Sequence, residues 1–132
     1  MKKQITILFV MALFVFVGCT TTNAQKSELK RVTPAEFSQL MQQDVQLVDV
    51  RTDQEYQSGH LQGAAQIDIN SPSFSEKLAK LDKTKPVLVY CASGGRSSRA
   101  SQTLKSMGFE QVYDLQGGIS NWMATGNKVV KD

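Results

Sequence analysis

The segment 86–108 places a cysteine between a strand and a helix. Val87–Tyr90 is a short apolar run after a proline, which is typical of a buried strand. A turn of small residues follows it, and from 97 to 107 apolar residues recur on one helical face at Ala100, Leu104 and Met107. A turn of this kind leaves free backbone N–H groups at the start of the helix, where an anion can bind. The sequence therefore predicts Cys91 as the first residue of an anion-binding loop.

Cys91 is the candidate nucleophile of this loop. The positive end of the helix and the guanidinium groups of Arg96 and Arg99 are expected to lower its pKa toward the thiolate. The alternative is that Cys91 only fills a core position, because free cysteine is among the most buried residue types. The adjacent glycines and Arg96 favour the nucleophile, and the position at the end of a strand agrees with where parallel sheets hold their sites.

The length of 132 residues fits one domain plus an export segment. The chain has 15 basic and 12 acidic residues, a formal charge of +3. Removal of Lys2 and Lys3 with an export segment leaves 13 basic against 12 acidic residues, or +1. This balance gives no indication of a nucleic-acid partner.

The first 18 residues predict a signal peptide. Lys2 and Lys3 form a positive start, Ile5–Val17 is an apolar run, and Gly18 and Cys19 follow. The run is shorter than the ~20 residues that a membrane-spanning helix needs, so a transmembrane anchor is the weaker alternative and plain secretion the stronger one.

The segment 16–19, Phe-Val-Gly-Cys, resembles the lipobox of bacterial lipoproteins, with Phe16 where leucine is usual. The resemblance implies lipid attachment at Cys19. We expect a signal peptide over 1–18, a lipidated tether over 19–29 and a folded domain over 30–132. The protein would then be anchored to the membrane in the bacterial cell envelope, on the periplasmic side in a Gram-negative cell.

Two cysteines limit the covalent chemistry of the chain. If Cys19 carries lipid, Cys91 is the only thiol and no internal disulfide can form. A 19–91 disulfide is the alternative if Cys19 stays free. A lone thiol in an exported protein is exposed to oxidants, so its presence indicates that the thiol has a function.

Strands alternate with helices along the rest of the chain. Thr33-Pro34-Ala35-Glu36 is a capping box that starts a helix with apolar residues at 37, 40 and 41. Further helices are expected over 52–58, 71–81, 97–107 and from 119 to 123. Strands are expected to start at Val32 and to cover 46–50, 65–69, 87–90 and 110–115. This alternation predicts a single-domain α/β fold with a mostly parallel sheet.

Two local features have structural interpretations. His60 is the only histidine and lies beside a glycine turn, which favours a hydrogen-bonded structural residue over a general base. Without a second histidine or a cysteine cluster we expect neither a metal site nor a cofactor. Gly117 and Gly118 predict a tight turn with close backbone approach, and Trp122 is expected in the core.

Three segments together resemble the rhodanese family, in its single-domain thiosulfate sulfurtransferase form. They are LVDVR at 47–51 with GHLQGA at 59–64, then VLVYCASGGRS at 87–97, and then VYDLQGGI at 112–119 with Trp122. The resemblance implies a five-stranded parallel sheet with helices on both faces and Cys91 as the sulfur-accepting nucleophile. It also implies that a substrate loop binds mainly through backbone N–H groups of Ala92, Ser93, Gly94, Gly95 and Arg96. The elements at Asp49/Arg51 and Gly59/His60 correspond to structural motifs of the family.

The loop length favours sulfur over phosphorus. Cys91 and Arg96 form a Cys-x4-Arg loop, whereas relatives that act on phosphate or arsenate carry a loop one residue longer. We expect transfer of sulfane sulfur from thiosulfate or a persulfide donor, through a Cys91 persulfide, to a thiophilic acceptor such as cyanide or a thiol. The partners would be a small sulfur-containing anion and a thiol of a small molecule or protein. The alternatives are a persulfide- or redox-responsive binding module with little turnover, and a cysteine-based phosphatase or arsenate reductase.

Overall fold

The computed structural model describes residues 26–132, which build one five-stranded sheet. The strands are β1 (Glu28–Val32), β2 (Gln46–Asp49), β3 (Ala65–Gln66), β4 (Val87–Tyr90) and β5 (Gln111–Leu115). Their order is β1-β5-β4-β2-β3, and every neighbouring pair is parallel. The predicted parallel sheet is confirmed. The predictions of a signal peptide over 1–18 and of lipid on Cys19 lie outside the described residues.

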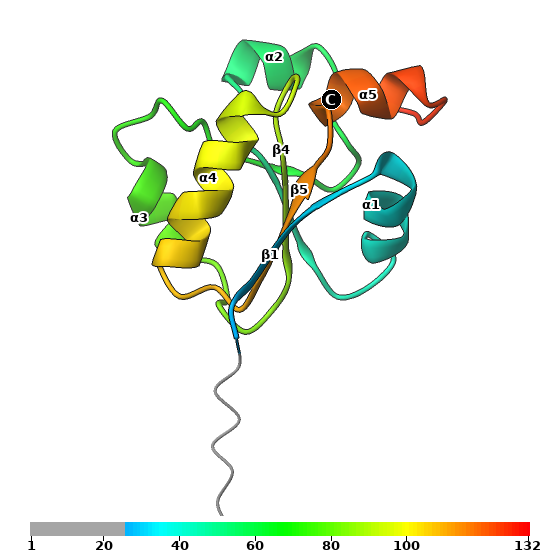
Figure 1. The fold of residues 1–132 in the computed structure, drawn as a ribbon. Helices are drawn as coiled ribbons and strands as arrows, with labels where there is room; N and C mark the ends of the chain where they lie inside the picture. The colour runs from blue at the N-terminus through cyan, green and yellow to red at the C-terminus, as the bar shows by residue number, and fades with distance from the viewer. Residues whose placement is uncertain (1–25) are drawn as a thin grey trace, which may run out of the picture.

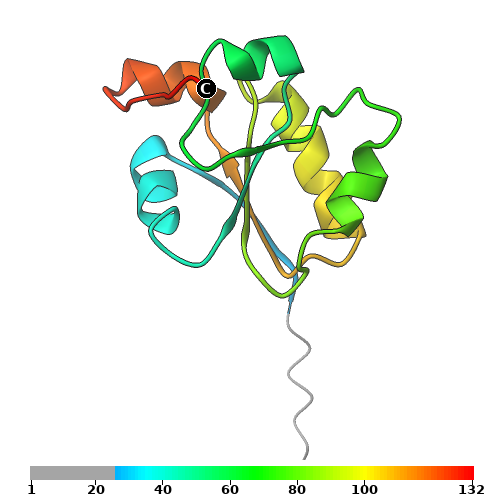
Figure 2. The same ribbon diagram turned by 180° about the vertical axis from the view of Figure 1, so that it is seen from behind.

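Five helices cover both faces of the sheet, as predicted. They are α1 (Pro34–Leu40), α2 (Asp53–Gln57), α3 (Phe74–Ala79), α4 (Gly95–Ser106) and α5 (Gly118–Ala124). Figures 1 and 2 show α3 and α4 on one side of the sheet and α1 and α5 on the other. Each side has its own apolar cluster, one centred on Leu78, Ala100 and Leu104, the other on Phe37, Ile119 and Trp122.

The central strand β4 is buried along its whole length. Val87, Leu88 and Val89 have no exposed surface, because helices pack on both faces of the sheet. Burial of each aliphatic side chain contributes roughly 1.5–3 kcal/mol to the free energy of unfolding. The strand therefore provides a rigid base for the cysteine that follows it.

The first helices begin where the capping residues predict. At α1 the Thr33 hydroxyl accepts from the backbone N–H of Glu36, and the Glu36 carboxylate accepts from the backbone N–H of Thr33. At α2 the Thr52 hydroxyl accepts from the backbone N–H of Glu55. These bonds satisfy N–H groups that the first helical turn leaves free.

Several element boundaries differ from the predicted ones. β1 ends at Val32, where a strand was expected to begin, and starts at Glu28, so Glu28 and Leu29 belong to the sheet rather than to the tether. The polar stretch hid this strand because only Leu29 of its first residues packs on the core. β3 is an edge strand of two residues, and α3 begins at Phe74 rather than 71.

A buried ion pair fixes the turn after β2. The Arg51 Nε lies 2.9 Å from Asp49 Oδ1, and Arg51 Nη2 lies 2.6 Å from Asp49 Oδ2 and 2.7 Å from the carbonyl oxygen of Gly59. The pair is nearly inaccessible to solvent, and its hydrogen bonds tie the end of β2 to the turn after α2. The structural interpretation of the Asp49/Arg51 and Gly59 elements is confirmed.

His60 and Trp122 also have structural positions. The His60 Nδ1 lies 3.0 Å from the carbonyl oxygen of Tyr56, its ring stacks on Tyr56 at 3.7 Å, and its backbone pairs with Val130. Trp122 packs against Phe37 with ring centres 6.2 Å apart, and its Nε1 donates to a backbone carbonyl. The interpretation of His60 as a hydrogen-bonded structural residue and that of Trp122 as a core residue are confirmed. Within residues 26–132 no helix has the length and hydropathy to span a membrane.

Candidate active site

Cys91 lies directly after β4, at the carboxyl end of the central strand. The loop that follows turns sharply at Gly94, whose φ of +113° suits glycine, and α4 begins at Gly95. This start is two residues earlier than the apolar pattern predicted, because no apolar residue marks the first turn. The start of α4, α2 and the start of α5 lie at the same end of the sheet (Figure 1).

The Sγ atom of Cys91 makes polar contacts with the loop and with the first turn of α4. The backbone N–H of Gly94 donates to Sγ at 3.0 Å, and the Cys91 thiol donates to the Ser97 Oγ at 3.4 Å. Burial raises the pKa of the Cys91 thiol, but hydrogen bonds from the Ser97 hydroxyl and from the backbone N–H groups of Ser97, Gly94 and Ser93 outweigh it. The pKa is thus lowered from its ordinary value, which favours the reactive thiolate.

The loop beside Cys91 is less buried than the cysteine. Cys91 is 1% exposed, while Ser93 and Gly95 are exposed and Ala92, Gly94 and Arg96 are half-buried. Cys91 packs in the apolar cluster on the α4 side of the sheet, but its surroundings are not apolar alone. Here polar hydrogens converge on Sγ from a surface loop, which favours the nucleophile over that alternative.

The arginines play a smaller part in the acidity of Cys91 than we predicted. Arg96 makes a two-pronged ion pair with Glu55, its Nη1 and Nη2 each 2.8 Å from a carboxylate oxygen. The hydrogen bond from Arg96 is the largest cause that lowers the pKa of Glu55 to about 2, so this carboxylate is ionised near neutral pH. The charge on Cys91 raises the pKa of Arg96 less than Glu55 does. Arg99 is exposed on α4.

The start of α5 holds the other side of the loop. The backbone N–H groups of Ile119 and Ser120 donate to the carbonyl oxygens of Cys91 (2.9 Å) and Ala92 (3.1 Å). Gly118 directly precedes these two residues and has a φ of +61°. A Cβ at position 118 would lie 2.5 Å from the Cys91 carbonyl oxygen. Because α5 binds these carbonyl groups, the loop can direct its N–H groups toward Sγ.

Three features of the site escaped the sequence analysis. Ser97 stands in the first turn of α4, where the residue type alone indicates only a helix start. Glu55 reaches Arg96 from another helix, 41 residues away in the chain, and no local pattern encodes that pair. The twin glycines did predict close backbone approach, but not that Cys91 would be the partner.

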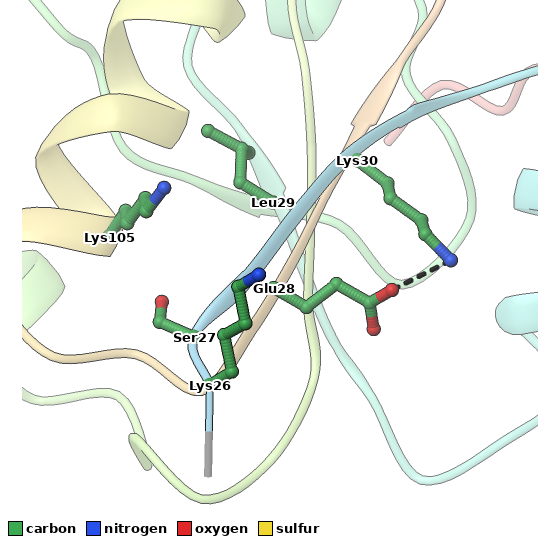
Figure 3. A pocket seen from close by; sticks show the side chains of 6 residues that line it. All are labelled: Lys26, Ser27, Glu28, Leu29, Lys30 and Lys105. Atoms are coloured by element: carbon green, nitrogen blue, oxygen red, sulfur yellow. Dashed lines mark ion pairs between the residues drawn. The ribbon is translucent and has the colours of Figure 1, made fainter. Parts of the chain in front are cut away.

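A cavity at the start of β1 lies far from this chemistry. Figure 3 shows it at the first residues of β1, with Lys105 from the last turn of α4 on its other wall. It measures about 470 Å³ and contains no cysteine, while Lys30 is turned to Glu28 at 2.7 Å. Cys91 is at the opposite end of α4, roughly 18 Å away for a helix of 12 residues. The loop after β4 therefore remains the candidate site.

Comparison with known proteins identifies the family of this domain. The family model described as the rhodanese-like domain matches residues 33–125, which is most of the chain. The chain belongs to the rhodanese family. The match covers α1 to α5 and includes the loop at Cys91, so the predicted family and its fold are confirmed for this rhodanese.

Relatives of this rhodanese carry different names. The thiosulfate sulfurtransferase GlpE of Pseudomonas savastanoi pv. phaseolicola is 37% identical over 99 residues, which is 75% of this chain and 92% of the relative. The uncharacterized protein YqhL of Bacillus subtilis is 32% identical over 120 residues, 91% of this chain and 93% of the relative. A tRNA uridine(34) hydroxylase of Cytophaga hutchinsonii is 44% identical over 94 residues, 68% of this chain but 30% of that protein. Sulfur transfer is the activity that these comparisons support at the level of the family.

Solved structures support the same architecture. The crystal structure of a rhodanese-related protein from Thermoplasma volcanium has a TM-score of 0.71 and 28% identity, covering 78% of this chain and 99% of that chain. A rhodanese-like domain protein from Staphylococcus aureus has a TM-score of 0.67 and 26% identity, covering 78% and 98%. The two solved chains are each covered almost in full, so this rhodanese shares their single-domain fold.

Proposed function

We propose that this rhodanese is a thiosulfate sulfurtransferase that works through a persulfide on Cys91. The observation that carries the proposal is the position of Sγ, 3.0 Å from the backbone N–H of Gly94 and within a loop whose N–H groups lower the pKa of the thiol. The relatives named thiosulfate sulfurtransferase support the choice of donor.

In the first step the thiolate of Cys91 attacks the outer sulfur of thiosulfate. A bond forms between Sγ and that sulfur, the sulfur–sulfur bond of thiosulfate breaks, and sulfite leaves with the bonding electron pair. The backbone N–H groups of Ser93 and Gly94 are placed to stabilise the negative charge as it moves to the outer sulfur. An ionised thiol needs no general base, which fits the structural position of His60.

In the second step a thiophilic acceptor attacks the outer sulfur of the persulfide. With cyanide the product is thiocyanate, and with a thiolate it is a new persulfide. In both cases Cys91 leaves as the thiolate, so the enzyme returns to its starting state. The N–H donors that bind the first thiolate also stabilise it as a leaving group.

Steady-state kinetics test this scheme. With thiosulfate and cyanide varied together, a covalent two-step mechanism gives parallel double-reciprocal lines. Intersecting lines would indicate that both substrates bind before sulfur moves, and absence of thiocyanate from a folded protein would favour a binding module with little turnover.

Arg96 is proposed as a contact for the anionic end of the donor. Its guanidinium group has five N–H donors, and Glu55 accepts from two of its nitrogens. Arg96→Ala is expected to raise KM for thiosulfate by about tenfold, the size of one lost hydrogen bond to a charged group, with a smaller effect on an uncharged polysulfane donor.

The control for this variant is Glu55→Gln, which keeps Arg96 but removes its charged partner. Glu55→Gln should change KM for thiosulfate less than Arg96→Ala does. Equal losses with both donors in Arg96→Ala would show that Arg96 supports the loop and does not contact the anion.

A further inference from the structure

Glu55 on α2 binds the one charged residue of the Cys91 loop. Arg96 is the only charged residue between Cys91 and Arg99 in the sequence, and its Nη1 and Nη2 each donate to a different carboxylate oxygen of Glu55 at 2.8 Å. The Thr52 hydroxyl donates to Glu55 Oε1 at 3.2 Å and accepts from the backbone N–H of Glu55 at 3.2 Å. The carboxylate is therefore held in place from its own helix as well as from the loop.

The pair of Glu55 and Arg96 carries no net charge near neutral pH. The carboxylate is ionised there, and the guanidinium group of an arginine stays protonated. The side chains of Arg96 and Glu55 are 24% and 34% exposed, so water and salt screen the pair only in part. Glu55 accepts one N–H from each terminal nitrogen, which leaves the guanidinium group with further N–H donors. Arg96 can thus hydrogen-bond to an anion without attracting it strongly from a distance.

A second arginine beside the end of β4 is neutralised in the same way. Asp49 pairs with Tyr90 in the parallel register of β2 and β4, one residue before Cys91. Arg51 binds the Asp49 carboxylate through two nitrogens, and its guanidinium carbon lies 5.6 Å from the centre of the Tyr90 ring. Both members of this pair are buried. Arg99 is exposed on α4, where salt screens its charge. Neither Arg51 nor Arg96 therefore offers an uncompensated positive charge to a substrate.

We propose that Glu55 is a specificity-determining residue, which offsets the charge of Arg96 so that the loop takes sulfane donors with one or no negative charge as well as the dianion thiosulfate. An uncompensated Arg96 would favour the dianion by Coulomb attraction. The donor class that fits is an alkyl persulfide, R–S–SH. The Cys91 thiolate bonds to its outer sulfur, which keeps its hydrogen, and R–S⁻ leaves with the electron pair of the broken sulfur–sulfur bond. The donor class rests on the proposed function, but the effect of Glu55 on charged reagents at Cys91 does not.

Alkylation of Cys91 by a charged and an uncharged reagent tests the effect of Glu55. Iodoacetate and iodoacetamide both form a carbon–sulfur bond with the thiolate as iodide leaves, but iodoacetate carries a negative charge. The full chain is used at one pH without any sulfur donor, and peptide mass spectrometry separates Cys91 from Cys19. Because both reagents need the same thiolate, a change in the pKa of Cys91 cancels in the ratio of the two rates.

Removal of either member of the pair should move this ratio in opposite directions. Glu55→Gln leaves Arg96 without a charged partner and should raise the rate with iodoacetate, relative to iodoacetamide, by about threefold, the effect of one partly screened charge. Glu55→Ala is the second neutral replacement and should act in the same direction. Arg96→Ala should lower the relative rate by about threefold, and the double variant Glu55→Gln/Arg96→Ala should restore it. Asp53→Asn removes a charge from α2 that is hydrogen-bonded to Gln57, and should change the ratio less than about 1.5-fold.

Equal rate changes with both reagents in Glu55→Gln and Glu55→Ala would overturn the proposal, because Glu55 would then support the loop without setting its charge. Sulfur-transfer kinetics test the donor class. Glu55→Gln should lower KM for thiosulfate by about threefold and leave KM for an uncharged polysulfane donor unchanged, and equal changes with both donors would overturn that class. Since no sulfur moves during alkylation, a protein that fails to transfer sulfur would contradict the proposed function and leave the alkylation result intact.

Discussion

Cys91→Ser is expected to lose sulfur transfer from thiosulfate to cyanide by at least about 1,000-fold in kcat/KM. A serine hydroxyl stays protonated near neutral pH, and its oxygen cannot form the persulfide that links the two steps. The fold should be retained, because serine is close in size and the loop N–H groups that face position 91 belong to the backbone. The measurement is thiocyanate production by the purified variant, with circular dichroism to verify folding.

Cys19→Ser is the matched control, since the chain has two cysteines. It should keep the activity of the unchanged protein. If Cys91→Ser retained activity, or if Cys19→Ser lost it to the same degree, the nucleophile would have to be assigned elsewhere.

Gly118→Ala is expected to lower kcat/KM by roughly 100-fold, which is the loss that a displacement of about 1 Å can cause at a reacting centre. The added Cβ would lie 2.5 Å from the carbonyl oxygen of Cys91 and 2.6 Å from that of Ala92, so the loop and α5 must separate. The hydrogen bonds from Ile119 and Ser120 to these carbonyl groups lengthen, and the N–H groups lose their direction toward Sγ.

Gly126→Ala isolates the contribution of backbone strain. Gly126 follows the other end of α5 with φ +86°, and a Cβ there meets no atom within 4 Å. Each variant should lose about 1–2 kcal/mol of unfolding free energy from the left-handed backbone, but Gly126→Ala should keep its activity. Thermal unfolding and kinetics measure both quantities. Full activity in Gly118→Ala would show that the contact with α5 does not position the loop.

The sequence alone identified the parts of this protein that depend on local patterns. The apolar run of Val87–Tyr90 and the small-residue turn were enough to place Cys91 at the end of a central strand, because burial and helix initiation are local effects. The capping box at Thr33 was enough to start α1 at Pro34. The family resemblance then implied a sheet of five parallel strands with helices on both faces, and the structure confirms it.

The parts that were missed depend on contacts between distant segments. The positive charge of Arg96 was expected to lower the pKa of Cys91, but Glu55 from α2 binds the guanidinium group of Arg96. β1 was placed too late because its pairing with β5, and not its own polar sequence, makes it a strand.

The most direct test of the account is the intact mass of the protein after treatment with thiosulfate, followed by peptide mapping. The account predicts a gain of one sulfur atom on Cys91 and its loss when cyanide is added. A protein that turns over thiosulfate without ever carrying sulfur on Cys91, or that carries it at another residue, would contradict it.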